Sequence, residues 1–64
     1  MLDKNVRVTD KCRTPEYAGL TGVVVDWDNW DKCWIVDLDR EYRESDGVWV
    51  ISLGLKDYEM EVIG

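Results

Sequence analysis

The sequence predicts an all-β fold, a small five-stranded barrel that residues 1–64 form as a single domain. Apolar residues recur with a period of two in five short runs, which is typical of half-buried strands. Turn-forming residues bound each run. Because 64 residues are too few for two full sheets, a strongly bent, partly closed barrel is the expected way to protect the strand edges.

The first three strands are expected at residues 6–8, 22–27 and 34–39, where β-branched and aromatic residues are concentrated. Turn chemistry separates them at Thr14-Pro15, Ala18-Gly19 and Asp28-Asn29. Strict alternation then predicts which side chains face the interior. They are Val6, Val8, Val23, Val25, Val36 and Leu38, and Trp34 shares a face of its strand with the last two.

The last two strands are expected at residues 47–51 and 58–62, after a turn at Ser45-Asp46-Gly47. Residues 52–57 are predicted to be a connection with at most one turn of 3₁₀ helix. The side chains expected to face the interior here are Val48, Val50, Tyr58, Met60 and Val62. So small a core gives only a few kcal/mol of net stability, so we expect it to recruit some of the Trp and Tyr residues.

Composition removes several classes of function. The chain has no His, which is the commonest general base and metal ligand. No apolar run approaches the roughly 20 residues of a membrane span, and Met1 to Lys4 lead into charge rather than a signal sequence. A barrel of this size has no room for an enclosed catalytic pocket. The sequence therefore predicts a cytoplasmic, non-enzymatic protein without cofactor, small-molecule substrate or membrane contact.

The two cysteines, Cys12 and Cys33, allow one intramolecular disulfide. That bond would close a loop of roughly 20 residues and needs an oxidising compartment. A zinc site would need four ligands at familiar spacings. We therefore expect two reduced, partly buried thiols that act as small apolar side chains.

Residues 6–8, the loop after them and residues 17–25 (Tyr-Ala-Gly-Leu-Thr-Gly-Val-Val-Val) resemble the KOW motif of small SH3-like barrels. Residues 57–63 are similar to the closing strand of such barrels. The resemblance implies an SH3-like barrel that binds RNA or docks onto a protein, as in NusG-type elongation factors and several large-subunit ribosomal proteins. By position, the family's glycine falls on Gly22, where it would permit a tight turn, and Gly19 marks the turn before it. Residues 13–17 would be the contact loop.

Charge separates this chain from the nucleic-acid-binding members of that family. The net charge is −6, and residues 26–46 hold eight acidic residues against three basic ones. Phosphate binding favours the opposite sign. Four basic residues nevertheless fall within the first thirteen positions, and beside Tyr17 they would form a stripe for single-stranded nucleic acid. They are Lys4, Arg7, Lys11 and Arg13.

The segment from Asp26 to Trp34 contains three Trp residues, more than so small a core can hold. We expect Trp30, at the loop tip, to be exposed and to anchor a protein partner or a cationic side chain. The sharpest form of this hypothesis is a cage of Trp27, Trp30 and Tyr17 for a methylated lysine or a basic tail, by analogy with Tudor-type barrels. In the alternative, Trp27 and Trp34 are core residues or a cross-strand pair, and Trp30 covers an open barrel end.

The acidic residues can be interpreted as structural and solvated, or as a binding surface. Asp26, Asp28 and Asp31 do not match a calcium loop, because the positions that need Gly and Glu hold Asp31 and Asp37. No metal site is predicted, and these aspartates are expected to satisfy backbone groups of the turn. The acidic hairpin from Asp37 to Asp46 is either a solvated surface or a docking surface for a basic partner.

The sequence thus favours a non-catalytic protein-binding module whose Trp-rich acidic surface docks a basic partner or a larger assembly. The residues expected to make this contact are Tyr17, Trp27, Asp28, Trp30, Asp31, Asp39, Glu41 and Tyr42. The second hypothesis is a nucleic-acid-binding module of the transcription or translation machinery that uses Arg7, Lys11, Arg13 and Tyr17. A third is that the acidic surface imitates nucleic acid, and a fourth is an accessory subunit that functions only inside an assembly.

Overall fold

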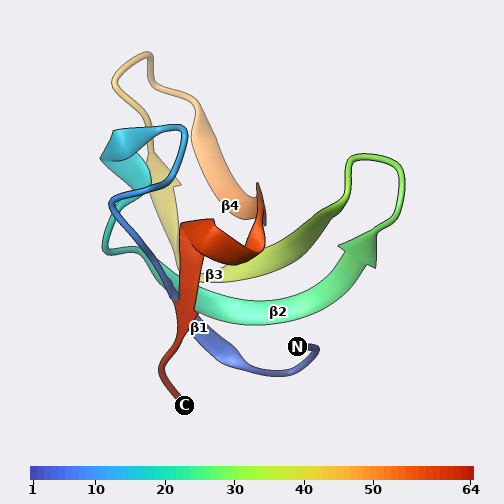
Figure 1. Ribbon diagram of the computed structural model, residues 1–64. Coiled ribbons are helices and arrows are strands. Elements are labelled where there is room, and N and C mark those ends of the chain that lie inside the picture. Colours follow the sequence, from blue (N-terminus) through green and yellow to red (C-terminus); the bar gives the residue numbers. More distant parts are fainter.

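The computed structural model describes residues 1–64 and contains one five-stranded antiparallel sheet (Figure 1). Its elements in chain order are β1 (Asn5–Val8), η1 (Pro15–Tyr17), β2 (Thr21–Asp28), β3 (Cys33–Arg43), β4 (Trp49–Leu55), η2 (Asp57–Glu59) and β5 (Met60–Val62). The two η elements are single turns of 3₁₀ helix, and no helix has the length and apolarity needed to span a membrane. The predicted all-β class is confirmed.

The sheet is strongly bent and barrel-like, and the N-terminal strand β1 lies inside it between β2 and β5. The strand order is β4-β3-β2-β1-β5, so the chain returns after η2 to place β5 against β1. The pairing of β2 with β3 shifts between Val24 and Asp26, and the pairing of β3 with β4 shifts between Asp37 and Tyr42. Such irregularities bend a strand and raise its twist, and here they curve the long β2 and β3 (Figure 1).

The core is a cluster of buried apolar side chains from β1 to β5 and the loop after β1. Its members are Val6, Val8, Cys12, Val24, Val36, Leu53, Leu55 and Met60. Tyr17, Leu20, Trp34, Leu38 and Val50 are partly buried against it. The predicted inward positions of Val6, Val8, Val36 and Met60 are confirmed, and the expected recruitment of Tyr and Trp is seen at Tyr17 and Trp34.

The predicted phase of β2 is wrong. Val24 is fully buried, Val23 is only partly buried and Val25 is exposed. Before the register shift Gly22 and Val24 are the buried positions, so the alternation there is regular but has the opposite phase to the predicted one. After the shift at Val25 the phase changes, and Trp27 pairs with Trp34. A bulge inserts one residue and so changes which side chains face the core.

The end of the chain also differs from the prediction. β4 extends to Leu55, so Leu53 and Leu55 belong to the core rather than to a connection. Val48 lies in the turn and is exposed. The 3₁₀ turn occupies residues 57–59, which turns Tyr58 outward and buries Glu59, and Val62 at the chain end is exposed.

The two glycines singled out by the KOW resemblance have different roles. Gly19 has a φ of +92° and is the turn residue. Gly22 lies inside β2, so the tight turn predicted at this residue is wrong. A Cβ at Gly22 would stand 2.3 Å from the carbonyl oxygen of Asp37, so glycine is required by the close approach of β3.

Candidate functional site

The turn between β2 and β3 is held in one conformation by its own side chains. Asp28 Oδ1 accepts hydrogen bonds from the backbone N–H groups of Trp30 (2.9 Å) and Asp31 (3.2 Å). Lys32 adopts a left-handed backbone with φ +56°, and its Nζ donates to Asn29 Oδ1 at 2.8 Å. Asp28 therefore satisfies turn backbone groups, as predicted from the sequence.

Trp30 stands at the tip of this turn with 92% of its surface exposed. Its side chain has no hydrogen-bond partner and no aromatic neighbour. The predicted exposure of Trp30 is confirmed. The alternative in which Trp30 covers an open barrel end is wrong, because an indole so exposed covers nothing.

Trp27 and Trp34 form the cross-strand pair that was the alternative to an aromatic cage. They are partners in the β2–β3 register, and their ring centroids lie 4.6 Å apart at an interplanar angle of 58°. Trp34 Nε1 also donates to Asp57 Oδ1 at 2.7 Å, which links the pair to η2. Trp27 therefore packs on Trp34 as a structural cross-strand pair. It flanks the turn, and its ring does not face Trp30 across a cage.

Tyr17 lies elsewhere and cannot complete a cage with the Trp residues. Its ring packs edge-on against Tyr42, with centroids 5.6 Å apart, and its hydroxyl donates to the Glu44 carboxylate. Tyr42 is eight residues along β3 from Trp34, up to about 26 Å for an extended strand. The hydrogen bond to Glu44 raises the pKa of Tyr17 to about 12. The pKa of Tyr42 is raised by burial and, in addition, by the negative charge of the nearby Glu16. The predicted Trp27–Trp30–Tyr17 cage is therefore wrong.

The residues predicted to bind a protein thus divide into two groups. Trp27, Asp28, Trp30 and Asp31 lie together at the β2–β3 turn. Tyr17 and Tyr42 lie together near the far end of β3, where Glu41 is exposed and makes no hydrogen bond. Asp39 accepts a hydrogen bond from the Thr21 hydroxyl at 2.8 Å. We call the first group, with Asp26, the Trp30 turn.

The basic residues near the N-terminus do not share one environment. Arg7 forms the chain's single ion pair, with Glu61 of β5, and Arg7 Nε donates to Glu61 Oε1 at 2.8 Å. Arg13 lines a groove, and Lys11, which precedes it in the loop after β1, is exposed. Arg7 is therefore paired with a carboxylate, whereas Lys11 and the side chain of Arg13 have no ion-pair partner.

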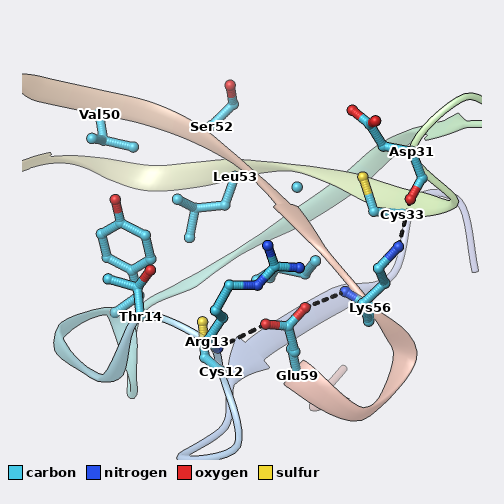
Figure 2. Close-up of a pocket in the computed structure, with 13 residues that line it drawn as sticks. Cys12, Arg13, Thr14, Asp31, Cys33, Val50, Ser52, Leu53, Lys56 and Glu59 are labelled. Carbon is cyan, nitrogen blue, oxygen red and sulfur yellow. Dashed lines mark hydrogen bonds between the residues drawn. The ribbon is translucent and has the colours of Figure 1, made fainter.

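The sequence interpretation missed that groove, an open cavity of about 560 Å³ between β4 and the loop after β1 (Figure 2). Glu59 lies on its floor, 4% exposed, and its carboxylate accepts the backbone N–H groups of Arg13 (2.9 Å) and Lys56 (2.8 Å). Burial alone would raise the pKa of Glu59, but these hydrogen bonds and the Arg13 charge lower it overall. The sequence carries no signal for this arrangement, because Lys56 has no side-chain acceptor and does not match the Ser/Thr-x-x-Glu signature of a capping box.

Both cysteines border the groove and are buried, which confirms the predicted burial. Burial raises the pKa of the Cys33 thiol, and the neighbouring Asp28 adds to this. A raised pKa lowers the fraction of reactive thiolate. The cysteines therefore act as packing residues.

Comparison with protein-family models, curated proteins and solved structures finds no match to this chain. The KOW resemblance stays a prediction, and function has to be inferred from the side chains themselves.

Proposed function

We propose that this chain is a non-catalytic protein-binding module that docks a basic partner through the Trp30 turn. The observation that carries the proposal is an indole 92% exposed at the tip of an ordered turn. Transferring about 200 Å² of apolar surface from water into a partner's pocket is worth about 5 kcal/mol. Trp is also the residue type most enriched among interface hot spots.

The order of the turn supports this function. The two hydrogen bonds to Asp28 fix the backbone on either side of Trp30, and the Lys32–Asn29 bond fixes the other side of the turn. A preformed loop loses less conformational entropy on binding than a flexible one. The backbone that carries Trp30 therefore needs little further ordering when the indole enters a pocket.

Charge indicates the chemistry of the partner. Residues 26–46 hold eight acidic residues against three basic ones, and the whole chain carries −6. The carboxylate of Asp31, beside Trp30, is exposed and accepts no hydrogen bond. A rim of this sign steers and selects a basic surface.

The two unpaired thiols fit a reducing compartment, so we place the activity in the cytoplasm. Nucleic-acid binding ranks second because the pairing of Arg7 with Glu61 reduces the free cations of that hypothesis.

Affinity capture from the source cell with three baits tests the proposal. We expect a basic protein to be retained by the wild type and by Tyr58→Ala, which removes another exposed aromatic ring, 62% exposed. Trp30→Ala should release it. Asp31→Asn removes a negative charge from a side chain that makes no hydrogen bond, so it should slow association with the basic partner at low salt. Equal retention by Trp30→Ala and Tyr58→Ala would overturn the proposal.

A further inference from the structure

A second surface lies at the outer edge of the sheet and adjoins the Trp30 turn at Asp31, which lines the same groove. β4 pairs with β3 on one side and has no strand on the other. Outside the β3–β4 ladder, no hydrogen bond from any backbone or side-chain group involves the backbone of residues 49–55. Alternate N–H and C=O groups of β4 are therefore unpaired and form a template for another strand.

This edge lacks the protection that edge strands usually carry. Residues 47–55 contain no charged residue and no proline, in a chain of which 34% is charged. Trp49 and Ile51 are 57% and 65% exposed. An uncharged edge with exposed apolar side chains favours pairing with another chain.

The groove follows the same edge. Its lining includes Val50 and residues 52–55 of β4, and Arg13, Thr14 and Tyr17 line it from the loop after β1 (Figure 2). A residue in a sheet occupies about 160 Å³, taking a rise of 3.3 Å, a strand spacing of 4.8 Å and a sheet spacing of 10 Å. The cavity of about 560 Å³ thus holds three to four residues of one extended chain.

Arg13 supplies the charge that specifies the occupant. Its guanidinium reaches into the groove near Leu53 (Figure 2) and has no hydrogen-bond or ion-pair partner. The Glu59 carboxylate is occupied by two backbone N–H groups, and Lys56 Nζ donates to the backbone carbonyls of Asp31 and Lys32. Arg13 therefore offers unused donors for an incoming carboxylate.

We propose that an extended peptide segment of a protein partner adds to β4 as a sixth strand and places a carboxylate on Arg13. Main-chain hydrogen bonds to β4 give the segment its direction, and the Arg13 contact fixes its register. A second copy of this chain fits less well, because residues 47–55 contain no carboxylate to meet Arg13 and two chains of charge −6 repel each other.

The test is selection of a random eight-residue peptide library on the immobilised protein, followed by synthesis of the enriched peptides. We expect an Asp or Glu at a constant position, and slowed hydrogen exchange at alternate amides of residues 49–55 when the peptide binds. Arg13→Gln should weaken binding about tenfold or more, since a charge-assisted hydrogen bond is lost. Arg40→Gln, which removes an exposed guanidinium outside the groove, should leave binding unchanged.

Three outcomes would overturn the proposal. They are no enrichment, equal binding to wild type and Arg13→Gln, or protection confined to the Trp30 turn. A dimer in sedimentation with the β4 amides already protected would also overturn it, because the edge would then belong to a second copy. Because Trp30 does not line the groove, failure of Trp30 as a docking anchor would leave these results unchanged.

Discussion

Glu59 gives the sharpest test of how this small fold holds together. Its buried carboxylate accepts two backbone N–H groups, one from Arg13 in the loop after β1 and one from Lys56 before η2. Each hydrogen bond to a charged acceptor is worth about 1.5–3 kcal/mol. Glu59→Ala leaves both donors without a partner, so we expect a loss of about 3–5 kcal/mol in the free energy of unfolding. That is a large part of the roughly 3–10 kcal/mol available to 64 residues.

The same group makes stability depend on pH. The pKa of Glu59 is lower in the folded chain than its ordinary value. Its contribution is therefore fully present above the unfolded-state pKa, about 4.3, and is lost as the pH falls through the folded-state pKa. Glu59→Gln keeps one acceptor oxygen without charge, so we expect a smaller loss than for Glu59→Ala and a weaker acid dependence than in the wild type.

Urea unfolding followed by Trp fluorescence at pH 7 and pH 3 measures both effects. Asp10→Asn is the matched control, because Asp10 is exposed and makes no hydrogen bond. We expect the wild type and Asp10→Asn to lose stability in parallel on acidification and Glu59→Gln to lose less. If Glu59→Ala costs no more than Asp10→Asn at pH 7, the assigned role of Glu59 is wrong.

Three further perturbations follow from the structure. Gly22→Ala places a Cβ 2.3 Å from the Asp37 carbonyl oxygen, so we expect it to prevent native folding, which the amide NMR spectrum will show. Absorbance titration should find the Tyr17 phenol ionising near pH 12, and Glu44→Gln should lower that pKa because it removes the carboxylate that accepts the hydroxyl proton; a Tyr17 pKa unchanged by Glu44→Gln would contradict this contact. Since the raised pKa stabilises the fold below pH 10, that contribution is lost as the pH rises through 12. Cys33 should react with a thiol reagent far more slowly in the folded chain than in urea, and equal rates would contradict its burial.

The sequence was sufficient to predict the all-β class of the fold and the exposure of Trp30. Alternating apolar residues at Val6 and Val8 and around Val36 identified β1 and β3, and the run of β-branched valines after Gly22 identified β2. Trp30 was predicted to be exposed because Asp28-Asn29 marks a turn and the core has limited volume. Both inferences depend on local chemistry, which a single sequence records.

Tertiary events account for what the sequence did not predict. Three consecutive valines do not indicate which of them faces the core, so neither the phase of β2 at Val23 to Val25 nor the bulge after Val24 could be predicted. Glu59 is buried because loops far apart in the chain bring two N–H groups to it. Tyr17 packs on Tyr42 rather than near Trp30 for the same reason, since the length of the curved β3 separates the two sites.

The central claim is that the Trp30 turn docks a basic protein surface. A titration of ¹⁵N-labelled protein tests it most directly, because the four Trp indole N–H signals report Trp27, Trp30, Trp34 and Trp49 separately. We expect a Lys- and Arg-rich peptide to shift the Trp30 indole and the amides of residues 28–32, and single-stranded RNA and duplex DNA to shift nothing at physiological salt. Salt-sensitive shifts with RNA at Arg7, Lys11 and Arg13, together with an unmoved Trp30 indole in the peptide titration, would contradict the claim.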